Sequence, residues 1–249
     1  MNKKTLFCIA SLATVSLSSL TVILSAVAEP LPWKSNQLTR RVFNPQTSAV
    51  RIGFVPPAGE GTPRHTRGAA SRTGCDALQI LPESVSGLTT EPRPLIPAYF
   101  SENVNEVLLA IEAADGSEFY EYASGKTISL PAGGGVATVP LPDALVELAP
   151  NKQYTWSIIL ICGDEEIGPS TPVIRGDIKR VDPILTPTER ATTPLAEKEK
   201  LYGQAGLWYD LIATMTLMQE ANPDNPQLTQ RWESLLRSVG LDGVFEDNA

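Results

Sequence analysis

The sequence of 249 residues contains few of the side chains on which metal sites and nucleophilic enzymes depend. Its only histidine is His65, and its three cysteines are Cys8, Cys75 and Cys162. A structural zinc site needs about four nitrogen or sulfur ligands, so none is expected. A Ser-His-Asp triad is not expected either, because His65 lies in "GEGTPRHTRGAASRTG", a run of loop-forming residues. Neither G-x-S-x-G nor H-E-x-x-H occurs, and the sequence predicts no enzyme, cofactor or metal centre.

Positive charge is also scarce, since 20 lysine and arginine residues stand against 28 aspartate and glutamate residues, a net charge of −8. An acidic protein is a poor partner for nucleic acid and for anionic membranes. Residues 29–74 differ from the rest of the chain because they carry a net positive charge. Their arginines include Arg40, Arg41, Arg64, Arg67 and Arg72. We expect a solvated arm there; contact with an anionic surface, or with the acidic part of the same chain, is the alternative.

Long apolar runs are absent after the first 28 residues. The chain begins with the basic "MNKK", continues with an apolar, serine-rich stretch over residues 6–24, and then has small residues at Ala26 and Ala28. This order is typical of a secretory signal peptide cleaved after Ala28, with a membrane anchor as the alternative. We therefore expect an exported protein, in the periplasm or at the extracellular surface, without a transmembrane segment after cleavage.

Cleavage leaves two cysteines, Cys75 and Cys162. An even pair in an exported chain predicts one disulfide, with free structural thiols as the alternative. Closing a loop of this length stabilises a fold by roughly 4–5 kcal/mol in the chain-entropy description.

The composition divides the mature chain into three zones. Residues 29–74 are rich in proline, glycine and arginine and are expected to be largely disordered, apart from a strand-like island at residues 50–55. Residues 75–185 contain short β-type runs between turn signals, which predict an antiparallel β-sandwich. The runs are "ALQILP", "LIPAYF", "VNEVLLAIEA", "SEFYEY", "KTISLP", "GVATVPLP", "QYTWSIILIC" and "TPVIRGDIKRV". The Asp-Gly pair in "ADGS" predicts a hairpin turn.

The stretch "LAPNKQYTWSIILIC" combines two aromatic residues, a lysine and a cysteine. Side chains alternate along a strand, so Tyr154 and Trp156 belong to one face. Leu148 and Pro150 precede them, an arrangement similar to the tyrosine corner of fibronectin type III and immunoglobulin-like sandwiches. We therefore predict a structural corner and core position for these residues, with a ligand platform as the alternative.

Residues 193–241 change to a helical period. Thr193 is expected as an N-cap with Pro194 at the first helical position. Gly206, Trp208 and Pro223 have the spacing of one tetratricopeptide unit, and a third helix over residues 227–237 would cap the pair.

One such unit cannot form a peptide groove, because about three repeats are needed. We expect a small helical appendage. The alternative is a docking site, whose candidate partner-contact residues are Tyr202, Trp208, Tyr209 and Trp232.

Several motifs together resemble one family. They are "RGAASRTGC", "GLTTEPRP", "KQYTWSIILIC", "VIRGDIKRV", "LYGQAGLWYDLIATM" and "WESLLRSVGL", in this order along the chain. They resemble the cyanobacterial exported proteins grouped as domain of unknown function 928. The resemblance implies an exported protein and provides no catalytic residues to transfer.

The combined prediction is a mainly β protein with a helical C-terminal tail, acting as an exported cell-envelope interaction or structural module that binds an envelope protein. A carbohydrate-processing hydrolase that uses acidic residues is one alternative. Asp164, Glu165 and Glu166 form an acidic run, where a solvated turn is expected and weak calcium binding is the other interpretation. An accessory or chaperone factor for an exported partner is the third hypothesis.

Overall fold

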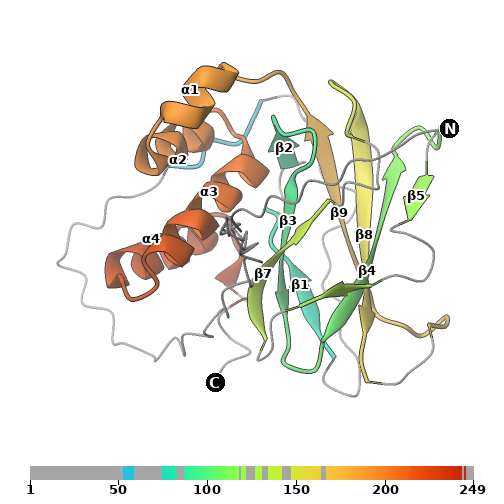
Figure 1. Cartoon of the computed structure of the whole chain (residues 1–249). Helices are drawn as coiled ribbons and strands as arrows, with labels where there is room; N and C mark the ends of the chain where they lie inside the picture. Colours follow the sequence, from blue (N-terminus) through green and yellow to red (C-terminus); the bar gives the residue numbers. More distant parts are fainter. Residues whose placement is uncertain are drawn as a thin grey trace, which may run out of the picture. The chain divides into compact units, whose positions relative to one another are not determined.

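Figure 1 shows the computed structural model of the chain. It describes residues 53–58, 75–82, 87–117, 119–121, 127–130, 134–141, 147–163, 167–242 and 244, all within the unit Trp33–Ala249. In these ranges, two β-sheets precede four helices. The predicted mainly β fold with a helical C-terminal region is therefore confirmed. The expected signal peptide lies outside the described residues.

One sheet has three antiparallel strands in the order β1-β3-β7. These are β1 (Ala77–Gln79), β3 (Leu95–Phe100) and β7 (Gly135–Pro140). The other sheet has the order β2-β9-β8-β4-β5, with β6 also paired to β4. Its strands are β2 (Gly87–Thr89), β4 (Glu106–Ala113), β5 (Phe119–Glu121), β6 (Ile128–Ser129), β8 (Gln153–Ile161) and β9 (Val173–Arg180).

Each of the eight predicted β-type runs contains one strand, and the "ADGS" turn joins β4 to β5 as expected. Strand β2 was not among the predicted runs. It is three residues long, fully buried and parallel to β9, so it lacks the alternation that identifies a half-buried strand.

The centre of the larger sheet is β8, which pairs with β4 on one side and β9 on the other. Its burial alternates strictly, and the inward residues are Tyr154, Trp156, Ile158 and Leu160. This is the pattern expected of a strand with one face on the core.

The two sheets are joined covalently. Cys75, just before β1, forms a disulfide with Cys162, just after β8, and their Cα atoms are 6.1 Å apart. The predicted disulfide is confirmed.

The four helices are α1 (Pro187–Thr192), α2 (Leu195–Gln204), α3 (Trp208–Ala221) and α4 (Pro226–Ser238). Helix α1 was not predicted, although Thr186 and Glu189 form a capping box with proline at the first turn, a signal present in the sequence. Thr193 is the C-cap of α1, so the expected N-cap is wrong by one residue and Pro194 takes that position for α2. Gly206, at φ 70°, separates α2 from α3 as expected.

The helices and the sheets share one hydrophobic core. Helix α3 packs against β2 and β3, and α2 packs against α3. The C-terminal helices are thus an integral layer of the fold. In the described ranges, no helix combines the length and the apolar character that crossing a membrane requires.

Part of the predicted disordered arm is bound to this helical layer. Phe54 lies edge-on to Trp208, with ring centres 4.9 Å apart, and the Val55 N–H donates to the Gly203 carbonyl at 3.0 Å. Residues 53–58 form no strand, so the strand-like island expected at residues 50–55 is wrong for its described part. A β-strand needs a series of backbone hydrogen bonds to a neighbouring strand, and Val55 makes one such bond to the end of a helix.

Candidate functional site at the sheet–helix junction

The first turn of α3 places three consecutive side chains against the strands. The Trp208 indole N–H donates to the Ile80 carbonyl at 2.8 Å. The Tyr209 hydroxyl donates to the Asp177 carbonyl at 3.0 Å and accepts from the Trp156 indole N–H at 2.6 Å. Both residues that start the helix are therefore buried and hydrogen-bonded to the sheets.

Close approach of β2 to α3 depends on Gly87. A Cβ atom at this position would lie 2.1 Å from a carbon of the Tyr209 ring. Glycine is therefore the residue that lets the strand lie flat against the ring.

Asp210, the third residue of α3, carries the most perturbed carboxyl of the junction. One of its oxygens accepts the Thr90 N–H at 3.0 Å, and the other accepts the Thr90 hydroxyl. Burial raises the pKa of Asp210 to about 6, against the hydrogen bonds from Thr90 and Thr89, which lower it. Its place in the first turn also sets a negative charge against the positive end of the helix dipole.

A second acid and its partner lie next to this carboxyl. Glu91, just after β2, forms an ion pair with Arg190 of α1 at 2.5 Å. That hydrogen bond raises the pKa of Arg190. Tyr202 of α2 is buried, and its pKa is raised first by burial and then by the charges of Asp210 and Glu91. We call Thr90, Glu91, Arg190, Tyr202 and Asp210 the junction cluster.

A carboxyl with a pKa near 6 has the proton affinity of a general acid. In the junction cluster, however, Asp210 is only 5% exposed and both its oxygens are bound by Thr90. The arrangement therefore binds the end of β2 to the start of α3.

A second polar contact lies on the far side of α3. Glu199 of α2 is 1% exposed at its side chain and forms an ion pair with Arg231 of α4. Burial raises the pKa of Glu199, while the charge and the hydrogen bond of Arg231 lower it.

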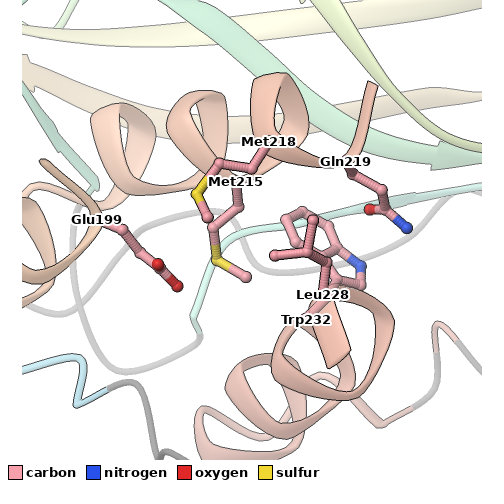
Figure 2. A pocket seen from close by; sticks show the side chains of 6 residues that line it. All are labelled: Glu199, Met215, Met218, Gln219, Leu228 and Trp232. Atoms are coloured by element: carbon pink, nitrogen blue, oxygen red, sulfur yellow. The ribbon is translucent and has the colours of Figure 1, made fainter. Parts of the chain in front are cut away.

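Figure 2 shows a pocket beside Glu199, lined also by Met215, Met218, Gln219, Leu228 and Trp232. Its volume of about 10 Å³ is room for one water molecule. Small-molecule sites are far larger, about 300–1,000 Å³. We call it the α3–α4 pocket.

One family model matches most of the chain. The family model described as Domain of Unknown Function (DUF928) matches residues 61–248, which include both sheets and all four helices. The chain belongs to this family. The family predicted from the motifs is confirmed, whereas the cyanobacterial and exported character that the resemblance implied stays a prediction. No curated protein matches the chain.

The shared core explains why one DUF928 domain spans the strands and the helices together. The four aromatic residues that were considered for partner contact, Tyr202, Trp208, Tyr209 and Trp232, are between 0% and 6% exposed. The docking-site alternative placed these rings on a contact surface, but the helix faces that carry them pack inside the domain.

At the corner of the DUF928 domain, the Tyr154 hydroxyl accepts the Ala149 N–H at 3.0 Å. Leu148 is buried, and its carbonyl accepts from the Arg180 guanidinium at 2.7 Å. Pro150 is exposed. Tyr154 and Trp156 are buried side chains of the core face.

The acidic run Asp164, Glu165 and Glu166 and the single histidine, His65, lie outside the described residues. Among the side chains that the structure does describe, no three of His, Cys, Asp or Glu gather as metal ligands would.

Of the junction cluster, sequence reasoning named only Tyr202, and it gave that residue a different role. It missed the pair Glu199–Arg231 as well. Thr90 and Asp210 are 120 positions apart, so no local pattern relates them. One available signal was the acidic residue in the first turn of a helix.

Proposed function

We propose that this DUF928 protein is an exported cell-envelope module that works by binding another protein or by a structural role. The disulfide Cys75–Cys162 carries the proposal. Disulfides persist in oxidising compartments, and this chain begins with a signal-peptide pattern that ends at Ala28.

A binding role is supported by how the two perturbed carboxyls are used. Asp210 joins β2 to α3, and Glu199 joins α2 to α4. Each serves the packing of the domain, and the α3–α4 pocket has room only for about one water molecule.

We infer that the two sheets form an immunoglobulin-like or fibronectin III-like sandwich. The neighbours β4, β8 and β9 correspond in order to strands C, F and G, and β1, β3 and β7 to A, B and E. The Tyr154 hydroxyl bond to the preceding corner supports this assignment. The disulfide departs from the usual B–F bridge. An experimental structure with β8 at a sheet edge would contradict the assignment.

We likewise infer that α2 and α3 form a tetratricopeptide-like pair. They pack together, Gly206 turns the chain between them, and Pro223 follows α3. Leu211 stands where that motif prefers a small residue. Crossing angles measured from an experimental structure test this inference.

Export is tested through the expected cleavage site. Secretion of the full chain should give a mature protein that begins at Glu29, read by N-terminal mass spectrometry. Ala28→Phe should block processing, because this position needs a small side chain, whereas Ala26→Ser should be processed normally. An intact N-terminus on correctly exported wild-type protein would contradict the proposal.

Binding is tested at the most exposed large apolar side chain of the described residues, Phe119 on β5, at 63%. A photo-crosslinking amino acid at position 119 should capture a discrete envelope protein in cells. The same probe at the exposed, polar Glu197 of α2 is the control. Equal labelling at both positions, or none at 119, would count against a binding surface there.

A further inference from the structure

The methionines of this protein are concentrated in one place. The chain has three, Met1, Met215 and Met218. The last two lie on α3, three positions apart, and positions with this spacing share a helix face. Both line the α3–α4 pocket, and Figure 2 shows them extending from α3 toward the side chains of α4.

The opposite wall of the pocket belongs to α4. Trp232 and Leu228 reach toward the methionines from this helix. Helix α4 also buries Leu235 and Leu236. Thioether sulfur makes favourable contacts with aromatic rings and fills irregular gaps, so the methionines are suited to hold α4 in place.

The two methionine residues differ in exposure. Met215 is buried at 6% exposure, whereas Met218 is partly exposed. An oxidant dissolved in the surrounding water therefore reaches Met218 more readily. The cysteines Cys75 and Cys162 are already joined and offer no thiol to compete.

We infer that Met218 is a site of reversible oxidation that controls the docking of α4 on α3. A peroxide transfers one oxygen atom to a sulfur lone pair. The O–O bond breaks, the sulfur loses two electrons and becomes a sulfoxide, and the peroxide is reduced to water if it is hydrogen peroxide or to an alcohol if it is an organic peroxide. Methionine sulfoxide reductases reverse the change.

The pocket leaves the oxidised side chain little room. A sulfoxide is bulkier and far more polar than the thioether, so it fits poorly against the apolar Leu228 side chain and the face of the Trp232 ring. It would face Trp232 and Leu228 in a gap with room for about one water molecule. The Glu199 carboxylate in the same lining is itself an acceptor and is occupied by Arg231. Oxidation thus favours a conformation in which α4 separates from α3.

The test uses the mature, disulfide-bonded protein and dilute hydrogen peroxide. Peptide mapping should find one added oxygen at Met218 before Met215. Hydrogen–deuterium exchange over residues 226–238 should then accelerate by about tenfold or more, as expected when a buried contact is lost. Exchange in β8 should not change, and a sulfoxide reductase should restore the slow exchange of α4.

Met218→Leu is the matched variant, because it keeps the apolar volume and removes the sulfur. Its α4 should exchange slowly with and without peroxide, whereas Met215→Leu should respond like the wild type. Oxidised Met218 with unchanged α4 exchange would overturn the inference. Peroxide-driven opening that persists in Met218→Leu, or earlier oxidation of Met215, would overturn it as well.

Discussion

The two faces of α3 are held in different ways. Toward the sheets, Trp208, Tyr209 and Asp210 make directional hydrogen bonds to residues in the strands or directly after them. Toward α4, the same helix offers Met215 and Met218 beside a small pocket. Hydrogen bonds in a buried site specify one arrangement, whereas unbranched thioethers adapt to several. The comparison indicates a rigid sheet–helix junction and a more adaptable α3–α4 contact.

The largest expected difference between the two contacts of α3 comes from removing one tryptophan at each, Trp208 on the sheet side and Trp232 of α4 on the other side. Trp208→Ala should lower the free energy of unfolding of the whole domain by about 3–5 kcal/mol, because it opens a cavity in the shared core. Trp232→Ala should instead release α4 while the sheets remain protected. Denaturant unfolding and hydrogen exchange measure the two effects. Equal global losses in both variants would remove the distinction between the faces.

The second prediction concerns pH at the junction. The pKa of Asp210 is raised from 3.8 to about 6, so the folded state binds the proton more tightly than the unfolded chain. The free energy of unfolding should therefore decrease as pH rises from about 4 to about 6, by on the order of 2–3 kcal/mol from this group. Chemical denaturation across this range measures the slope.

Asp210→Asn is the control, since the amide does not titrate. In this variant the free energy of unfolding should fall less steeply with rising pH than in the wild type. Some decrease should remain, because the pKa of Glu199 is raised as well. A variant that keeps the full wild-type slope would show that Asp210 is not the group responsible.

Tyr209→Phe should have a moderate effect. The change removes the acceptor of the Trp156 indole N–H and the donor to the Asp177 carbonyl, in a fully buried position. Leaving a buried group unpaired lowers the free energy of unfolding by about 1–3 kcal/mol. Tyr154→Phe at the part-buried corner should lower it by about 1 kcal/mol, and thermal unfolding of both variants compares them. A larger loss of stability in Tyr154→Phe than in Tyr209→Phe would contradict this prediction.

The smallest effect is expected on the outer face of α4. Arg237 lies 3.5 Å from Glu233 one turn away, and its side chain is 51% exposed. Arg237→Ala should change the free energy of unfolding by less than about 0.5 kcal/mol. A loss above about 1 kcal/mol in denaturant unfolding would mean that this face has a further structural role.

Much of the local structure followed from the sequence. Alternation and turn residues located eight strands, the Asp-Gly pair located the β4–β5 hairpin, and helical spacing located α2, α3 and α4. Each of these signals operates within a few residues, where side-chain period and backbone preference are sufficient. The even cysteine count, together with the expected export of the chain, was enough to predict Cys75–Cys162.

Two elements, α1 and β2, were not predicted, for different reasons. The sequence does contain a local signal for α1, the capping box at Thr186 and Glu189. Strand β2 is different, because it exists only where the sheet, through β9, and α3 enclose it, and its three residues have no pattern of their own.

By itself, the sequence determined every strand of the described residues except β2 and every helix except α1, together with which cysteines pair and which residues face inward along β8. Only the tertiary structure decided that Trp156 meets Tyr209, 53 positions away, and that Asp210 meets Thr90, 120 positions away. Those contacts depend on how the sheets and helices pack, and packing brings together residues that no period along the chain relates. The sequence thus singled out Trp208 and Tyr209 of α3 as candidate contact residues. Whether they face a partner or the core depends on the sheets against which α3 packs.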